Sequence, residues 1–192
     1  MHIAAYIVLA LAFGICNMLL FRRCAELTPI RLSRGLLVTI AVAAAQCALF
    51  LLGMLLGDLL RFELPDDSTA FAKANALIFL GLDIIVMLRM LKPYLRREPK
   101  LPLFDLTSNR ACSALALTAA VNPLLVGLGA GFVASTDDMH KVWPILMLVL
   151  MWLLGYWGVM LGRQKVAMRP VRWMIIAAVL LLGVGIAAMV NA

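Results

Sequence analysis

Residues 111–134 read ACSALALTAAVNPLLVGLGAGFVA. This stretch indicates that the chain lies in a membrane, and it contains an Asn-Pro pair that is unusual inside a membrane span. It is long and apolar enough to cross a bilayer, because about 20 helical residues span the hydrocarbon core. Its middle nevertheless contains Asn122, Pro123 and three glycines. A proline removes one backbone donor and clashes with the carbonyl four residues earlier. We therefore expect a kink near Ala119 and a carbonyl there that needs another hydrogen-bond partner.

The composition predicts an all-α integral membrane protein. Of the 192 residues 65% are hydrophobic, and the mean hydropathy is +1.02, whereas about half of the residues in a soluble domain are apolar. The apolar runs are about 20 residues long and lack the alternation of barrel strands, which favours helices. We predict six transmembrane helices, at residues 3–21, 35–60, 74–91, 111–134, 142–161 and 173–190.

The basic residues lie mainly on one side of these spans. The net charge is +7, and all but three of the 17 lysines and arginines lie in or beside the loops that follow spans one, three and five; the exceptions are Arg61, Lys73 and Lys141. The positive-inside rule makes this side cytoplasmic, which places both termini in the periplasm or outside the cell. Because topology explains the charge, the basic residues do not indicate nucleic-acid binding.

The two halves of the chain correspond weakly to each other. Asn17-Met-Leu-Leu resembles Asn122-Pro-Leu-Leu, Leu51-Leu-Gly resembles Leu153-Leu-Gly, and Leu80-Gly-Leu-Asp-Ile resembles Leu182-Gly-Val-Gly-Ile, at nearly constant offset. Three spans per half is an odd number, so the second half enters the membrane in the opposite orientation. We predict two inverted three-helix repeats, residues 1–92 and 111–192, joined by a cytoplasmic loop at 93–110.

Polar side chains inside spans mark either functional sites or interhelical hydrogen bonds. Asn17, Gln46, Asp83 and Asn122 lie deep in spans one, two, three and four. The three amides fit either role. Asp83 is the acid deepest within a span, and a buried unpaired carboxylate takes up a proton sooner than it stays charged. We predict a shared polar site near mid-membrane, with Pro123 as a kink and nearby glycines that let helices pack closely. These glycines are Gly53, Gly57, Gly81, Gly127 and Gly129.

The sequence gives no indication of an enzyme. It lacks a Walker loop, an HExxH motif and a serine elbow, and His2 and His140 are far apart. Its four cysteines show no CxxC spacing and are interpreted as small apolar residues that help helices pack. Neither catalysis nor a cofactor is expected, because no nucleophile, base and oxyanion donors converge on any stretch.

These features resemble the bacterial manganese efflux pump (MntP) family, which is related to the LysE-type exporters. Span four of that family typically reads Asp-Ala-x-Ala-Val-Gly-x-Gly, so Val126, Gly127 and Gly129 match without a gap. The family's span two has a Glu followed by two spaced glycines, which correspond to Gln46, Gly53 and Gly57. The segment Ile78-Phe-Leu-Gly81 and the position of Asn17 resemble spans three and one.

The resemblance implies a secondary transporter of the bacterial cytoplasmic (inner) membrane that exports a small cation from the cytoplasm, with manganese as the family's cargo. The family's acidic positions are amides here, at Asn17, Gln46 and Asn122, and a basic position is Asp83. Amide oxygens lack the negative charge that best offsets the dehydration of a divalent ion. Asn17 and Asn122 are the candidate metal ligands, while Asp83 can hold a monovalent ion or accept a coupling proton.

Two alternatives remain open for the function. The chain can export a different small polar solute, or it can be a non-transporting membrane scaffold or partner subunit that kept the fold without the ion-binding carboxylates. The expected partners are the lipid bilayer and the small solute, and a homo-oligomer is compatible with the sequence.

Overall fold

The described part of the chain folds into six long helices. The computed structural model describes residues 3–28, 30–60, 69–95, 104–134 and 142–191, and these residues contain no strand. The helices are α1 (Ile3–Leu27), α2 (Leu32–Leu60), α3 (Thr69–Leu95), α4 (Asn109–Val133), α5 (Trp143–Arg163) and α6 (Pro170–Val190). All six are long and apolar enough to cross a membrane. The prediction of an all-helical chain with six candidate spans is therefore confirmed.

Several helices extend beyond the apolar runs that predicted them. α1 continues through Arg22 and Arg23 to Leu27, and α3 continues through Pro93 to Leu95. A backbone helix does not have to end where the hydrocarbon-compatible side chains end, so the apolar run marks only its minimum length. The predicted connecting loop at 93–110 is correspondingly shorter at both ends, and its residues 96–103 lie outside the described part of the chain.

The segment before α4 is docked onto the start of α2. Ser108 caps α4 by accepting a hydrogen bond from the Ala111 backbone N–H. The Arg34 guanidinium donates to the backbone carbonyls of Leu106 and Thr107, each at 3.2 Å, and to the side chain of Asn109. These bonds connect the first turns of α2 and α4, two helices that then run together through the bundle.

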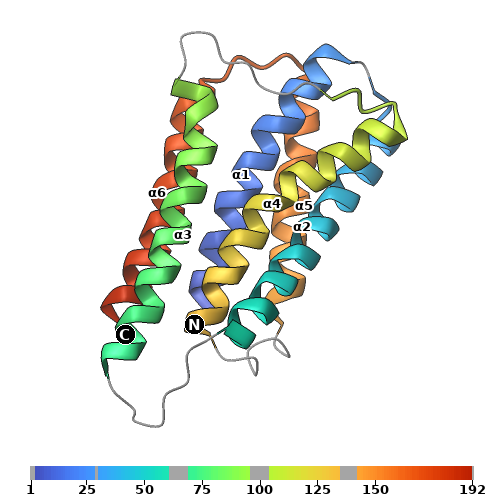
Figure 1. Ribbon diagram of the computed structural model, residues 1–192. Coiled ribbons are helices and arrows are strands. Elements are labelled where there is room, and N and C mark those ends of the chain that lie inside the picture. Colours follow the sequence, from blue (N-terminus) through green and yellow to red (C-terminus); the bar gives the residue numbers. More distant parts are fainter. Residues whose placement is uncertain (1–2, 29, 61–68, 96–103, 135–141, 192) are drawn as a thin grey trace.

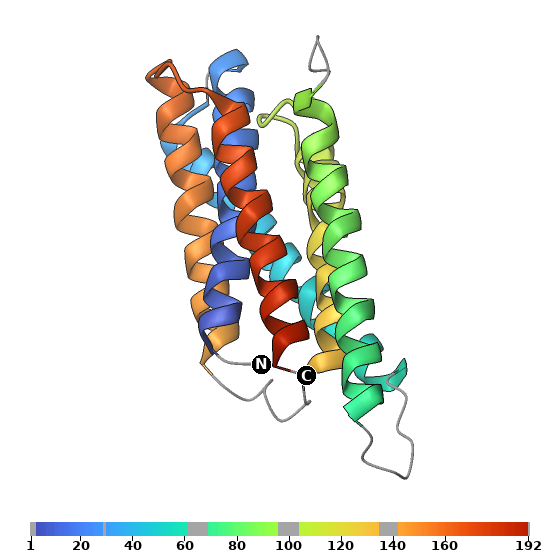
Figure 2. The same cartoon turned by 90° about the vertical axis from the view of Figure 1, so that its left-hand side faces the viewer.

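The helices associate in a definite set of pairs (Figures 1 and 2). The most extensive contacts join α2 to α4 and α1 to α5, and α3 packs along α6. Smaller contacts join α3 to α4, α1 to α6 and α2 to α5. The result is a group of four helices, α1, α2, α4 and α5, with the α3–α6 pair beside it.

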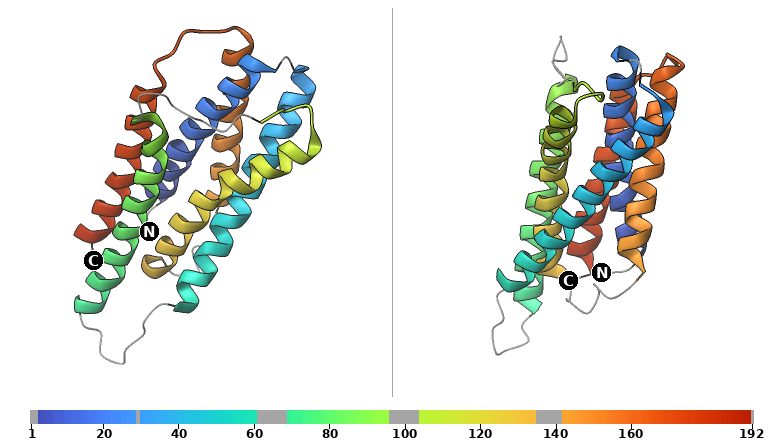
Figure 3. Two further views of the ribbon diagram at one scale, coloured as in Figure 1. Left: turned by 45° about the horizontal axis from the view of Figure 1, so that its top comes forward. Right: turned by 90° about the vertical axis from the view of Figure 1, so that its right-hand side faces the viewer.

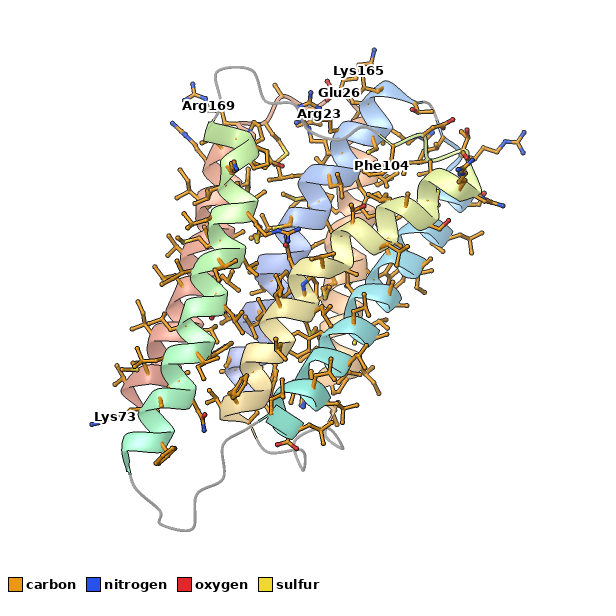
Figure 4. The ribbon with its side chains drawn as sticks, viewed as in Figure 1. Arg23, Glu26, Lys73, Phe104, Lys165 and Arg169 are labelled. Atoms are coloured by element: carbon orange, nitrogen blue, oxygen red, sulfur yellow. The ribbon has the colours of Figure 1, made fainter. Side chains whose placement is uncertain are left out.

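The two ends of the bundle differ in charge. α1 begins and α6 ends at the same end of the molecule in every view, whereas α4 begins at the opposite end, where α1 ends (Figures 1 and 3). Arg23, Glu26, Lys165 and Arg169 lie at that opposite end, and Lys73 lies at the end of the termini (Figure 4). The described basic residues are thus separated along the bundle in the way that the loops predicted.

Glycines allow the backbones of α2 and α4 to approach closely. In α2, a Cβ on Gly53 would collide with the carbonyl oxygen of Leu124, and a Cβ on Gly57 would collide with that of Leu128. In α4, a Cβ on Gly127 would collide with the carbonyl oxygen of Phe50. Such small-residue contacts are the usual way in which helices associate tightly in lipid. Gly158 and Gly162 of α5 meet the backbone of α1 in the same manner, at the Met18 and Arg22 carbonyls.

The other two glycines that the sequence singled out differ in their surroundings. Gly129 of α4 lies against Phe79 of α3. Among the described residues, and apart from the backbone of its own helix, Gly81 has no neighbouring atom within 4 Å of the position that a Cβ would take, and the same holds for Gly183 of α6. Gly81 is therefore not a close-packing position in this structure.

Close packing at Gly57 predicts a clear effect of one added methyl group. Gly57→Ala should lower the free energy of unfolding by about 1–3 kcal/mol, since the methyl would overlap the backbone of α4. Gly81→Ala is the matched control, because its methyl enters open space in a helix interior. Reversible unfolding in mixed micelles measures the free energy of unfolding of both variants. Equal stability of the two would contradict the described α2–α4 contact.

Candidate functional site

Asn17 and Gln46 form a buried amide pair between α1 and α2. Asn17 Nδ2 donates to Gln46 Oε1 at 2.6 Å, and Gln46 Nε2 donates to Asn17 Oδ1 at 2.9 Å. Their side chains are only 2% and 3% exposed. The Asn17 Cβ also lies 3.6 Å from the position that a Cβ would take on Gly155, so the pair contacts α5 as well.

The same pair satisfies the backbone carbonyl that Pro123 deprives of its helical partner. Gln46 Nε2 donates to the Ala119 carbonyl oxygen at 3.2 Å, and Ala119 is four residues before Pro123 in α4. The sequence predicted that a carbonyl near this position would need a partner, and this bond confirms it. α4 remains a continuous helix across the proline and changes direction in its middle (Figure 1).

These bonds give the amides of Asn17 and Gln46 a structural role. Each side-chain oxygen already accepts a hydrogen bond from the other residue, and Gln46 joins three helices. Buried polar bonds of this kind hold membrane helices in register. For the two oxygens to coordinate a cation in place of these bonds, the amides would have to rotate out of the observed arrangement.

Asn122 is placed differently from the amide pair. Its side chain is half-buried, and its Oδ1 atom is buried without a hydrogen-bond partner among the described residues. No hydrogen bond between described residues links Asn122 to Asn17 or Gln46. The structure therefore brings together two of the four predicted site residues by direct bonds, and it leaves Asn122 as a separate acceptor one helical turn beyond Ala119.

Asp83 lies at the contact between α3 and α6. It is fully buried, and a Cβ on Gly185 of α6 would lie 2.8 Å from its Oδ2 atom. Both carboxylate oxygens lack a hydrogen-bond partner among the described residues. Arg89, the basic residue nearest to Asp83 along the chain, is exposed, so the two side chains leave α3 in different environments.

The buried face of α3 places Asp83 in an otherwise mainly apolar row. The row recurs at helical spacing and consists of Asn75, Ala76, Phe79, Asp83, Val86 and Met90. Asn75 was not identified from the sequence, because it lies near the start of the span, where polar residues are common. Its Oδ1 atom is also buried without a partner among the described residues. Its spacing from Asp83 could have identified it, because residues two helical turns apart lie on the same face of a helix.

The described residues offer little for a divalent metal. They contain no group of three or more His, Cys, Asp or Glu side chains that could hold one ion. Cys47 donates to the Pro144 carbonyl at 3.5 Å and Cys16 to the Met174 sulfur at 3.9 Å, which are packing contacts. The arrangement instead offers one carboxyl group that can carry a proton or meet a small cation.

Comparison of the chain with known protein families, curated proteins and solved structures gives no match.

The amide pair predicts measurable coupling between Asn17 and Gln46. Asn17→Ala should destabilise the bundle, because it leaves the buried Gln46 amide short of a partner. In a double-mutant cycle with Gln46→Leu, we expect a coupling free energy of about 0.6–1.7 kcal/mol, as for other interhelical bonds in membranes. Unfolding in mixed micelles provides the measurement. Asn191→Ala is the control, since Asn191 is exposed and its side chain bonds, among the described residues, to the Ala187 carbonyl in the last turn of α6. Additive effects of the first two changes would contradict the bond.

Proposed function

We propose that this chain is a secondary transporter of the bacterial cytoplasmic membrane, with both termini periplasmic, that exports a small cation and uses Asp83 to bind the cation or a coupling proton. The observation that supports this most directly is the Asp83 carboxyl group, fully buried and without a hydrogen-bond partner among the described residues. Asp83 lies where α3 meets α6, so a relative movement of these two helices would change which side of the membrane has access to its carboxyl group.

An acid inside a membrane helix carries an energetic cost. Insertion of an Asp at the centre of a span costs about 2.5–3.5 kcal/mol, and no ion pair or hydrogen bond among the described residues offsets this cost. An apolar residue would pack in the same row more favourably. A carboxyl group that alternates between a proton and a cation gives a functional reason to keep it, because either one neutralises the charge.

A second polar atom supports a path along α3. The unpartnered Asn75 oxygen lies on the same buried face as Asp83, two turns nearer the end of the bundle that holds the termini. Under the proposed orientation, this is the periplasmic half of the helix. An amide oxygen there offers a dipole to a cation that leaves Asp83 toward the outside.

The helix contacts support an inverted repeat. If α1 is exchanged with α4, α2 with α5 and α3 with α6, the α2–α4 contact becomes the α5–α1 contact, and the α3–α4 contact becomes the α6–α1 contact. The α3–α6 and α2–α5 contacts map onto themselves. α1 and α4 also start at opposite ends of the bundle (Figure 1). In transporters with this plan, substrate sites lie near the midplane between the repeats.

The nature of the cation follows from the ligands. The resemblance to manganese efflux pumps suggests Mn²⁺, but a divalent ion needs several charged or strongly dipolar oxygens, and the described residues provide no cluster of acids. A monovalent cation or a proton requires only one carboxylate. We therefore propose a small monovalent cation or proton-coupled solute as the first substrate class to test, with manganese as the second.

Asp83→Asn should abolish cation-dependent proton flux in proteoliposomes, because the amide keeps the size of the side chain but cannot exchange a proton. A pH-sensitive dye inside the vesicles reports the flux while Na⁺, K⁺ or Mn²⁺ gradients are imposed. Cells that lack their own manganese exporter test manganese in parallel, through metal tolerance and total metal content.

Asp105→Asn is the matched control for this experiment. Asp105 is exposed in the segment before α4, and hydrogen bonds from Thr107 to its carboxylate, at 2.7 Å and 2.9 Å, lower its pKa. Asn retains an oxygen for these bonds, so flux should persist. If the unmodified protein changes neither manganese tolerance nor metal content, manganese export is wrong. If none of the gradients moves protons or cations, transport itself is contradicted.

A non-transporting scaffold or partner subunit is the second candidate, and the amide pair favours it. Asn17 and Gln46 satisfy each other and the Ala119 carbonyl, as expected of a bundle that only has to be stable. This candidate predicts no flux under any gradient, together with a membrane partner that remains bound through purification.

A further inference from the structure

A cavity opens at the end of the bundle where the basic residues gather. It has a volume of about 240 Å³ and lies between the end of α1, the end of α3 and the start of α6. Its lining residues are Leu19, Arg22, Arg23, Glu26, Leu27, Tyr94 and Pro170. Arg23 and Glu26 are at this end of the bundle in Figure 4. The cavity is separate from the residues discussed above, because neither Asp83 nor the amide pair lines it.

The Arg22 guanidinium is fixed in the wall of this cavity. Its Nη2 atom donates to the Val166 carbonyl at 2.8 Å, and it lies 3.6 Å from Glu26 Oε2. The Arg22 side chain is 13% exposed, and its Nε atom is buried without a partner among the described residues. A guanidinium has five N–H donors. Arg22 is therefore held in place while part of its donor capacity remains unused.

The remaining wall is amphipathic. Arg23 adds a second guanidinium, and no acid among the described residues lies within ion-pair distance of it. Tyr94 adds a phenol, and Leu19, Leu27 and Pro170 add apolar surface. Glu26 is the one acid in the lining, and at 41% side-chain exposure it is largely hydrated. Two guanidinium groups against one partly exposed carboxylate leave the cavity positive.

The start of α6 adds to this preference for an anion. Pro170 is the first residue of α6, and Arg169 at the N-cap makes no side-chain capping bond. Pro170 itself has no backbone N–H to donate, but the positive end of the α6 dipole lies beside the cavity and attracts anions. The C-terminal ends of α1 and α3 carry partial negative charge, which repels an anion. Arg22 and Arg23, in the last turns of α1, offset this charge at the end of α1. The geometry thus combines two guanidinium groups with the positive end of the α6 dipole at one cavity.

We propose that this cavity binds the phosphate group of an anionic lipid of the cytoplasmic leaflet. The cavity lies at the ends of the membrane spans, where headgroups are found, and Leu27 beside it is 59% exposed, so acyl chains can lie next to the phosphate. Its volume is below the 300 Å³ or more typical of drug-sized ligands and suits a single headgroup. Basic pockets between helices on the cytoplasmic side are a recognised form of lipid site. This inference does not depend on transport.

Binding of short-chain phosphatidylglycerol to the purified protein, followed by native mass spectrometry, tests the proposal. Phosphatidylglycerol should bind more tightly than short-chain phosphatidylcholine. Arg23→Gln should weaken its binding about fivefold, the effect expected for one basic residue at an anionic membrane surface, and Glu26→Gln should strengthen it. Arg31→Gln removes the same charge at an exposed position outside the cavity and should leave binding unchanged.

The second arm of the experiment distinguishes lipid from a soluble phosphate. If inorganic phosphate binds with the same dependence on Arg23 and Glu26 and displaces the lipid, the site accepts phosphate from solution, and the lipid assignment is overturned. Equal binding of the two lipids, or an equal loss in Arg23→Gln and Arg31→Gln, would show only a diffuse charge effect and would overturn the site. Because Arg22 also bonds to the Val166 carbonyl, the test uses Arg23 in its place.

Discussion

Inside a bilayer, each backbone carbonyl that loses its helical partner must find another one, because no water is there to replace it. Pro123 creates this need at Ala119, and Gln46 from α2 meets it with an N–H that is itself oriented by Asn17 from α1. The proline in α4 therefore requires a hydrogen-bond donor from a second helix, which is Gln46 of α2. That donor is in turn held by Asn17 of α1. The three long helices α1, α2 and α4 are held in one register by this set of bonds.

This requirement also decides what the amides can do. A resemblance seen in the sequence, to a family with acids at the corresponding positions, made Asn17 and Gln46 candidates for ion ligands. In the folded chain their oxygens already accept hydrogen bonds from each other. A ligand would have to replace bonds that stabilise α4 at its proline. Asp83 makes no such bond among the described residues, since both of its oxygens lack partners. A ligand could therefore bind Asp83 of α3 without breaking a hydrogen bond, which is not true of the two amides.

Much of the fold could be predicted because the membrane restricts the choices. Long apolar runs gave the six helices, and the effect of Pro123 on Ala119 followed from the geometry of proline alone. The helix ends could not be obtained this way, because residues such as Arg22 and Pro93 continue a helix beyond its apolar part. Nor could the sequence tell that Gly57 meets a backbone while Gly81 meets open space, since this depends on which helices become neighbours. The cavity beside Arg22 was missed for the same reason, because residues from α1, α3 and α6 define it.

The contrast between the glycines bears on which helices of the bundle could move relative to one another. α2–α4 and α1–α5 are joined where glycines meet backbone, so small displacements along these contacts produce collisions. The contact between α3 and α6 is less extensive than these two, and the atoms nearest to a Cβ on Gly185 there are side-chain atoms of Asp83 and Leu80, not carbonyl oxygens. Packed interfaces resist gradual deformation, so relative motion is least costly where packing is loosest. If the chain alternates between two states, the two glycine-packed pairs would move as rigid units, and the rearrangement would occur around α3 and α6. Asp83 lies at that contact, and a change in its charge would therefore act on the interface that is easiest to shift.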